Sequence, residues 1–440
     1  MKLAVFVLGR EVGILEPVGR FKSVFTYHAE TPPEGFVSLT MPVRTESYGW
    51  DAPLHPIFQM NLPEGYLLKV LQDEFGPHIG ADPTALLSVV GRHMIGRLQA
   101  AAPGANVDQT PQPFEVAEVL QGDNSEKAFA QLVRRHATSG VSGVIPKFLE
   151  GRDEPSGKDN KTTLFTGHYI IKGSSDRLPY IALNEHLCLE VARRVLPTTK
   201  TEVSDDGKAL VVHRFDTDTQ GRPHLGLEDF CVLLGLPPED KYKTTWERIA
   251  KAVHDHVPGL EQLNAFRHLA TTVLLTYALR NADCHAKNIA LLYSNRADVR
   301  MAPVYDMITT TAYSDYQNNP PGIAFMGKKT WLPGRSLERF IHERFGLPPR
   351  EQKETVERIC DAVSDVIPLV LEAMKTHVGF KDVGKRMLFS WEEGIAGLRD
   401  KKMYALGPWK SENMPKRISD APKVKARKKV IGRSEGLGER

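Results

Sequence analysis

The sequence has few cysteines and no long hydrophobic run, and both absences narrow the kinds of protein it can encode. Only four of its 440 residues are cysteine, and no two of them have the C-x-x-C spacing of a zinc module. This excludes a disulfide framework and favours a reducing compartment. No stretch approaches the roughly 18 apolar residues of a membrane span, and the apolar run at the N-terminus is too short for a secretion signal. We expect a soluble, cytoplasmic protein that does not bind membranes.

A strong charge of one sign is also absent. The chain has 57 Lys and Arg against 54 Asp and Glu, a formal net charge of +3. Such a balance argues against a protein whose whole surface binds nucleic acid. Hydrophobic residues at 41% and charged residues at 25% are typical of globular proteins, so a disordered chain, a collagen and a coiled-coil rod are excluded. The length predicts about two to four domains.

The first hundred residues predict a small α/β subdomain. Short apolar runs between turn residues are typical of strands, and two segments have helical spacing. We expect strands at 5–8, at 36–39 and around Phe58, and helices at 65–75 and 83–90. A stretch rich in Ala, Pro, Gly and polar residues at 101–113 predicts a linker. The first domain is therefore placed at residues 1–105.

The rest of the chain divides into a mixed segment, a mainly helical segment and a tail. Residues 106–225 contain one clear helix, 181–196, whose apolar residues recur with a period near 3.6. We expect strands at 144–149, 168–172 and 209–215. Residues 226–410 are mainly helical, with periodic runs at 263–279 and 355–374, and residues 411–440 are basic and aperiodic. The order of elements predicts an α+β fold.

Residues 279–306 bring together side chains that carry oxygen ligands. A helix ends, a polar loop follows, and two short strands form a hairpin around a polar turn. In the expected register Asn288 lies opposite Tyr305, and Asp306 comes next to it. Asp283, Asn288 and Asp306 should then converge at the open end of the hairpin.

Two carboxylates and a carboxamide that meet at one point suit magnesium carrying a nucleotide phosphate. The D-x-x-x-x-N spacing with a later Asp is the arrangement used in kinase phosphoryl transfer. The same spacing recurs by chance, and a solvated loop with ordinary capping roles is the alternative. A zinc site at Asp283, Cys284 and His285 is rejected, because three adjacent residues cannot all face one tetrahedral ion.

A kinase also needs a cation on the phosphates and a cover over them. Lys172 ends a predicted strand upstream of the helix that carries Glu185, which is the order of the lysine–glutamate pair in protein kinases. A strand-edge lysine that extends into water is the alternative. The small residues at 139–147 can bring backbone amides close to phosphate oxygens. A plain turn competes with that interpretation, because the GK[ST] of a P-loop is missing.

Two motifs, N-A-D-C-H-A-K-N at 281–288 and A-P-V-Y-D at 302–306, resemble the catalytic core of HipA-type serine/threonine kinases. These kinases are toxins of bacterial toxin–antitoxin modules. Weaker resemblances extend over about residues 1–400 and lie at 61–65, 86–91, 142–147, 184–185, 228–231 and 241–242. The resemblance implies a two-lobed protein-kinase-like fold, with an N-terminal α/β subdomain and an all-α C-lobe.

The resemblance also implies a role for each site residue. Asp283 would be the catalytic base, Asn288 and Asp306 would hold Mg²⁺, and Lys172 would contact the ATP phosphates. The other cofactor-binding residues would be Ser142, Gly143, Val144, Ile145, Pro146, Lys147, His213, Phe215, His285, Lys287 and Tyr305. His213 stands where relatives often carry an acidic residue, a departure that bears on the adenine contact. Autophosphorylation would fall on Ser139 or Ser142, and the register of the resemblance does not decide between them.

By the same resemblance, the chain would be an ATP- and Mg²⁺-dependent serine/threonine protein kinase. Its substrate would be an aminoacyl-tRNA synthetase, glutamyl-tRNA synthetase being the best-known target, and phosphorylation would cause growth arrest and persistence. Its partner would be a separately encoded HipB-like helix-turn-helix antitoxin, through which it would reach operator DNA. The rivals are a small-molecule phosphotransferase on the same scaffold and a catalytically idle co-repressor. The complete set of Lys172, Asp283, Asn288 and Asp306 argues against idleness.

The near-neutral charge hides a local asymmetry. Residues 411–440 carry nine Lys or Arg and four Asp or Glu, a local charge of +5 that leaves −2 for residues 1–410. A solvated, disordered terminus is one interpretation of this tail. The other is an accessory contact to operator DNA or to tRNA held by a synthetase.

Overall fold

The computed structural model describes most of the chain, with several short gaps. The described residues are 1–19, 21–62, 82–107, 114–138, 162–331, 334–404 and 406–415. Several sequence predictions therefore lie outside them: the helix at 65–75, the strand at 144–149, Ser139, the loop from Ser142 to Lys147, and the tail beyond residue 415.

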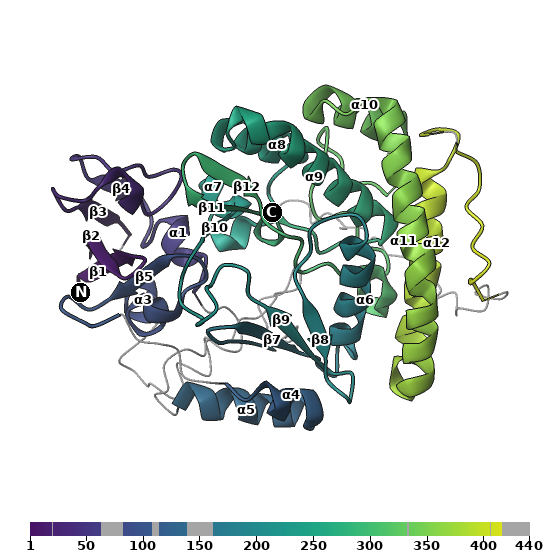
Figure 1. Cartoon of the computed structure of the whole chain (residues 1–440), viewed down its shortest axis with the longest axis horizontal. Coiled ribbons are helices and arrows are strands. Elements are labelled where there is room, and N and C mark those ends of the chain that lie inside the picture. Colours follow the sequence, from purple (N-terminus) through teal and green to yellow (C-terminus); the bar gives the residue numbers. More distant parts are fainter. Residues whose placement is uncertain are drawn as a thin grey trace, which may run out of the picture.

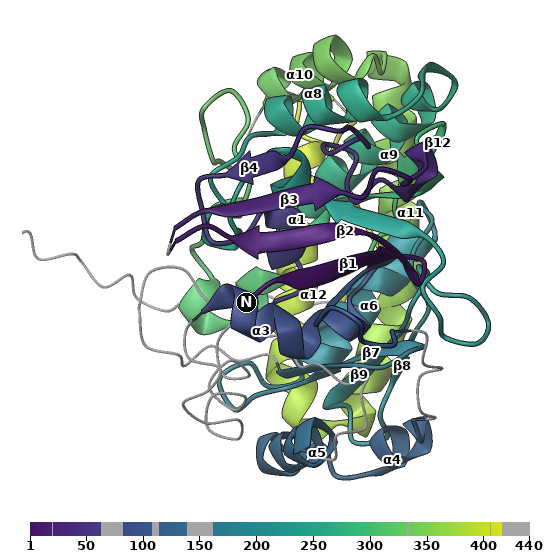
Figure 2. The ribbon, with the colours of Figure 1, turned by 90° about the vertical axis from the view of Figure 1, so that its left-hand side faces the viewer.

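The N-terminal domain is built on a five-stranded antiparallel sheet (Figure 2). Its strands stand in the order β4-β3-β2-β1-β5 and are β1 (Leu3–Val7), β2 (Arg10–Pro17), β3 (Ser23–Tyr27), β4 (Tyr48–Trp50) and β5 (Leu98–Ala101). The helices α1 (Pro56–Gln59) and α3 (Pro83–Val90) pack against it through Phe58 and Leu87, which are fully buried. The helix predicted at 83–90 is therefore confirmed.

Two strands predicted in this domain are wrong. Residues 36–39 form no strand, and only an isolated bridge joins Ser38 to Met41. Phe58 lies in α1, because Pro56 supplies the fixed φ of a first helical position. The His55 Nδ1 atom caps the same turn by accepting a hydrogen bond from the Ile57 N–H at 3.2 Å.

A second sheet lies between helices on both of its faces (Figure 1). Its order is β6-β7-β9-β8, with β6 (Thr162–Phe165), β7 (Tyr169–Gly173), β8 (Thr201–Val203) and β9 (Ala209–His213). Ile171 and Val211 pack under α4 (Val116–Gln121) and α5 (Glu126–Thr138). Leu210 and Val212 face α6 (Ile181–Arg193) instead, because successive strand side chains point to opposite faces.

The remaining elements form a helical lobe that also contains a small sheet. Its helices are α7 (Phe230–Leu233), α8 (Trp246–His256), α9 (Gly259–Ala278), α10 (Arg335–Phe345), α11 (Pro349–Thr376) and α12 (Lys381–Leu398). Its three strands are β10 (Gly226–Asp229), β11 (Ala290–Asn295) and β12 (Asp298–Met301). The runs predicted at 263–279 and 355–374 lie within or at the end of α9 and α11. The largest buried core of the molecule lies here, around Trp246 and Trp391.

Among the described residues, no helix is long and apolar enough to cross a bilayer. All four cysteines are buried free thiols.

Candidate active site

The polar loop between α9 and β11 is fixed by its own side chains. Arg280 follows α9 with a φ of 54°, the left-handed region that turns the chain sharply. The buried Asn281 then accepts a hydrogen bond from the Asp283 N–H through Oδ1 at 3.1 Å. Thr310, from the segment after the hairpin, accepts from the same N–H at 3.2 Å. Two acceptors therefore hold the backbone of Asp283 in place.

Lys172 links the second sheet to α6 and to the hairpin. Its Nζ donates to Glu185 Oε1 on α6 and to Asp306 Oδ1, the latter at 2.9 Å. The lysine side chain is only 14% exposed. Burial acts to lower the pKa of Lys172, but the two carboxylates outweigh it and raise that pKa well above the ordinary value. The lysine–glutamate pair expected from the chain order is present.

The side chains of Asn288 and Asp306 are in contact, although the hairpin does not have the predicted register. The Asn288 Nδ2 donates to Asp306 Oδ2, and Asn288 Oδ1 accepts from the His285 N–H at 3.0 Å. Asp306 has a φ of 57°, a conformation that costs energy outside glycine and is concentrated at functional sites. Asp306 thus contacts Lys172 with one oxygen and Asn288 with the other.

The hairpin register is one residue away from the sequence prediction. Tyr293 pairs with Val299, whereas the predicted pairing of Asn288 with Tyr305 requires residue 294 to face residue 299. A bulge between Tyr293 and Asn295 causes the shift, because it inserts an unpaired residue beside the turn. The predicted convergence of Asn288 and Asp306 survives because the regular pairing ends before either residue.

The other residues predicted to surround the nucleotide lie in two places. The Tyr305 hydroxyl donates to the Lys287 carbonyl at 2.9 Å, and its ring centre is 6.2 Å from that of Phe215. His213, at the end of β9, lies 2.6 Å from Glu202 through Nε2. His285 is buried beneath the loop, and burial keeps its pKa well below the usual value. The rings of Tyr305 and Phe215 therefore lie next to each other, whereas His213 pairs with Glu202 of the neighbouring strand β8.

The donor atoms at the hairpin fit a magnesium ion better than zinc. In the described part of the chain, no group of three His, Cys, Asp or Glu side chains is arranged to hold a metal. Burial raises the pKa of Cys284 to about 12, which disfavours the thiolate that zinc binds. Mg²⁺ needs only one or two protein oxygens and takes its other ligands from phosphate and water. Asp306 and Asn288 supply such oxygens.

Sequence reasoning missed three hydrogen bonds at the site, two made by Asn184 and one made by Tyr242. Asn184, the residue before Glu185, holds the backbone of Thr309 through both side-chain atoms, at 3.0 and 2.8 Å. The Tyr242 hydroxyl donates to Asp283 Oδ1. Asn184–Glu185 and Lys241–Tyr242 were both singled out by the resemblance, and that was the only signal available, since the partners are far apart in the chain.

Comparison with known proteins decides the family. The HipA-like C-terminal domain matches residues 139–367, and the HipA N-terminal domain matches residues 3–101. The chain belongs to the HipA family. Y4mE of Sinorhizobium fredii, which is named as a proposed kinase, is 27% identical over 359 residues, covering 76% of this chain and 83% of that protein. Y4dM of the same organism, named likewise, is 24% identical over 71% of this chain and 78% of its own length.

A solved structure confirms the fold of this HipA-family protein. HipA of Shewanella oneidensis, solved in complex with HipB and its operator DNA, superposes with a TM-score of 0.65 at 18% identity. The match covers 89% of this chain and 97% of that one. The predicted two-lobed, kinase-like α+β fold is therefore confirmed. The C-lobe is not all-α as the resemblance implied, because β10 pairs with β11 of the hairpin and completes a three-stranded sheet within it.

Proposed function

We propose that this HipA-family protein is an ATP- and Mg²⁺-dependent serine/threonine protein kinase. One observation carries the proposal: Lys172 bridges Glu185 and Asp306, and Asp306 in turn contacts Asn288. A protein kinase needs a lysine–glutamate pair and two metal ligands of these types. The relatives named as proposed kinases support the same activity.

Each residue has a defined task in this chemistry. ATP with Mg²⁺ supplies the phosphoryl group and the divalent charge, and Asp306 and Asn288 would hold the ion. Lys172, fixed by Glu185, would offset negative charge on the phosphates. Asp283 would orient the acceptor hydroxyl and accept its proton as the oxygen attacks the γ-phosphorus of ATP, whose bond to the bridging oxygen breaks so that ADP leaves. Phe215 and Tyr305 would stack beside the adenine ring of ATP.

We further propose that the chain is the toxin of a toxin–antitoxin module. Its structural relative was solved with HipB on operator DNA, which supports a HipB-like helix-turn-helix antitoxin as the partner here. The protein substrate would be an aminoacyl-tRNA synthetase, and glutamyl-tRNA synthetase is the first to test. Transfer of phosphate to a metabolite, but to no protein of a lysate, would favour the small-molecule phosphotransferase instead.

The activity is tested with Asp306→Asn. The purified chain, given [γ-³²P]ATP and Mg²⁺, should label itself, and the variant should lose at least about a hundredfold in rate because a metal ligand and the partner of Lys172 are both weakened. Omission of Mg²⁺ should have the same effect. The matched control is Asp298→Asn, because Asp298 is a half-exposed carboxylate on β12 of the same hairpin. This variant should label itself at the rate of the unaltered chain. No labelling by the unaltered chain, or equal labelling by Asp306→Asn, would refute the proposal.

A further inference from the structure

Tyr242 places its phenol on the carboxylate that would act as the base. Its hydroxyl donates a hydrogen bond to Asp283 Oδ1. Tyr242 lies between the short 3-10 turn at Pro238–Asp240 and α8, 41 residues before Asp283 in the chain. The chemistry proposed for the site uses Asp283 but gives the phenol no task.

The segment that carries Tyr242 is fixed to the site by several independent contacts. The Lys241 carbonyl accepts a hydrogen bond from the Ala286 N–H at 3.1 Å, which holds the segment on the catalytic loop. The Lys329 Nζ donates to the Tyr242 carbonyl at 3.2 Å. The Tyr242 ring meets the His285 ring edge to face, with centres 5.0 Å apart and planes at 81°. The bond from phenol to carboxylate is therefore built into the fold.

The segment after the hairpin, which carries Gly322 and Lys329, also lies against the same loop. The Lys329 Nζ donates to the Gly322 carbonyl at 2.6 Å. A Cβ atom at Gly322 would lie 2.1 Å from the Cys284 carbonyl oxygen, so only glycine allows this approach. Tyr242 is thus held between the catalytic loop and the segment around Gly322.

The contact controls the orientation of a base whose backbone is already held. The Asp283 N–H is held by Asn281 and Thr310, but those bonds leave the side-chain torsions undetermined. A neutral hydroxyl that donates to a carboxylate forms a short, charge-assisted bond with a narrow geometry. Such a bond at Oδ1 fixes the plane of the carboxylate, and with it the direction of Oδ2. A base must lie within hydrogen-bond reach of the proton it accepts, so this direction affects the rate.

We propose that Tyr242 is a positioning residue that orients Asp283 toward the acceptor hydroxyl. This inference rests on the proposed function, because it needs Asp283 to be the base. The contacts given for Tyr242 reach Asp283, His285 and Lys329, whereas Lys172, Asn288 and Asp306 form the nucleotide side of the site. Its loss should therefore slow phosphoryl transfer and leave ATP binding unchanged.

Tyr242→Phe tests the inference, since it keeps the ring on His285 and removes only the hydroxyl. Self-labelling of the full chain is followed with [γ-³²P]ATP and Mg²⁺ at increasing ATP concentrations. We expect the rate at saturating ATP to fall about tenfold, and the half-saturating ATP concentration to change less than about twofold. An unchanged rate would overturn the inference. A faster rate would also overturn it, and would mean that the phenol blocks the acceptor position.

Two further variants separate the possible failures. Tyr404→Phe removes a buried phenol that donates to Gln352 of α11, and it should leave the rate unchanged. A loss of rate in Tyr242→Phe that is matched by weaker ATP binding, or by a lower melting temperature than that of Tyr404→Phe, would indicate a structural role and refute positioning. Asp283→Asn is measured in parallel. If it labels normally, the base assignment fails; if it is silent while Tyr242→Phe is normal, only the role of Tyr242 fails.

Discussion

Lys172 is one ammonium group in contact with two buried carboxylates, those of Glu185 and Asp306. Glu185 is 2% exposed and Asp306 12% exposed in their side chains, so water screens little of their mutual repulsion. A hydrophobic replacement of such a group is often neutral or stabilising in other proteins. Fold stability therefore does not account for the group. Its place in the proposed chemistry does, because Lys172 would contact the phosphates and Asp306 would hold the metal ion.

Three buried or half-buried histidines make stability depend on pH. Burial, the main cause in each case, lowers the pKa of His55, His186 and His268 to about 4. An unfolded histidine binds its proton near pH 6.5, so between pH 6.5 and 4 the unfolded chain holds more protons than the folded one. The free energy of unfolding should therefore fall as the pH decreases through this window. Each histidine contributes about 1–2 kcal/mol of this fall between pH 6.5 and 5.

His268→Gln measures one of these contributions. Urea unfolding at pH 7.5 and at pH 5 should show a smaller loss of stability in the variant than in the unaltered chain, because one proton fewer is taken up on unfolding. His254→Gln is the control, since the His254 side chain on α8 is 70% exposed and should leave the difference unchanged. Equal pH dependence in the unaltered chain and in His268→Gln would contradict the prediction.

At the scale of elements, Asn184 ties α6 to the segment that follows Asp306. It donates to the Thr309 carbonyl at 3.0 Å and accepts from the Thr309 N–H at 2.8 Å, and neither residue is exposed. The Trp391 indole N–H donates to the Thr309 hydroxyl at 2.7 Å and joins α12 to the same point. Because Glu185 is the next residue on α6, this tie fixes the distance between Glu185 and Asp306.

Asn184→Leu should break the tie at nearly constant volume. Two buried backbone groups of Thr309 would lose their partners, which costs about 2–4 kcal/mol in total. We expect a lower urea midpoint, together with slower self-labelling, because α6 no longer holds Glu185 against Lys172. Asn264→Leu on α9, an exposed position, should alter neither property. A variant as stable as the unaltered chain would show that water or a rearrangement satisfies Thr309.

Local sequence patterns predicted some elements well. They failed where contacts between residues far apart in the chain determine the structure. The periodicity of 181–196 predicted α6, and the order of Lys172 and Glu185 predicted their pairing. The hairpin register was missed because a bulge beside a turn leaves no clear pattern in the apolar residues. The bond from Tyr242 to Asp283 spans 41 residues and has no periodic signal. The carboxylates and amides of the site could be identified in advance, but the groups that orient them could not.

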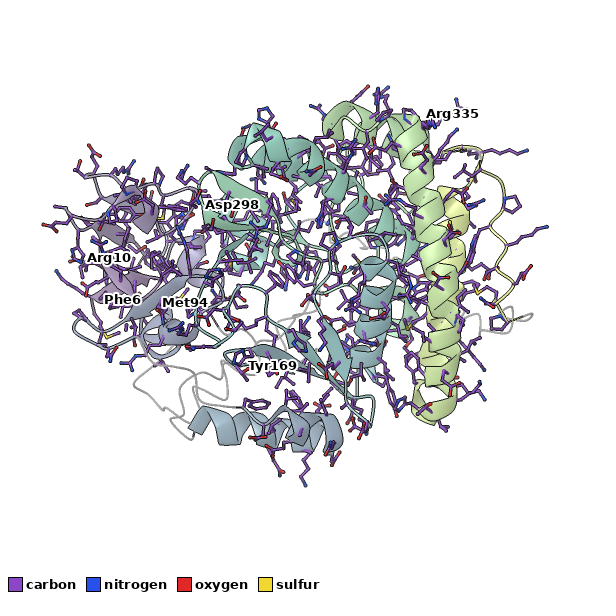
Figure 3. The ribbon with its side chains drawn as sticks, in the orientation of Figure 1. Phe6, Arg10, Met94, Tyr169, Asp298 and Arg335 are labelled. Carbon is purple, nitrogen blue, oxygen red and sulfur yellow. The ribbon has the colours of Figure 1, made fainter. Side chains whose placement is uncertain are left out.

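At the scale of the whole molecule, the N-terminal domain contacts both regions that form the site. The buried Asp216, in the segment after β9, pairs with Arg214 and accepts from the Gly96 N–H at 2.7 Å. Arg214 also donates to the Met94 carbonyl of the N-terminal domain at 3.2 Å. Figure 3 labels Met94 in that domain and Tyr169 on β7 of the second sheet.

The second contact of the N-terminal domain reaches the catalytic hairpin. Arg97 lies over the Phe36 ring at 4.0 Å and donates to the Ser294 carbonyl of β11 at 3.2 Å. The Phe36 ring stacks on Tyr293 of the same strand, with centres 5.5 Å apart. The domain therefore supports the strand that leads from Asn288, as well as the segment after β9, and it should stabilise the site as a whole.

Glu228 is the residue on which this support can be tested. Its fully buried carboxylate on β10 accepts from the Ser38 hydroxyl and the Leu39 N–H of the N-terminal domain, each at 2.7 Å, and from the Tyr293 hydroxyl at 2.6 Å. Burial raises the pKa of Glu228, whereas these donors act in the opposite direction. Glu228→Ala leaves three buried donors without a partner, which costs about 3–5 kcal/mol.

Because these donors join two domains, the loss of protection against amide hydrogen exchange in Glu228→Ala should differ from one element to another. Amide hydrogen exchange should accelerate in β1 to β5, because Ser38 and Leu39 of their domain lose a partner across the interface, and in β11, which carries Tyr293. By contrast α11, on the far side of the helical lobe, should keep its protection (Figure 1). Glu239→Ala, an exposed glutamate of the same lobe, should leave exchange unchanged everywhere. Uniform acceleration in Glu228→Ala would mean that the molecule unfolds as one unit. Faster exchange confined to the N-terminal sheet would mean that the hairpin is rigid without it, and that this domain does not support the site.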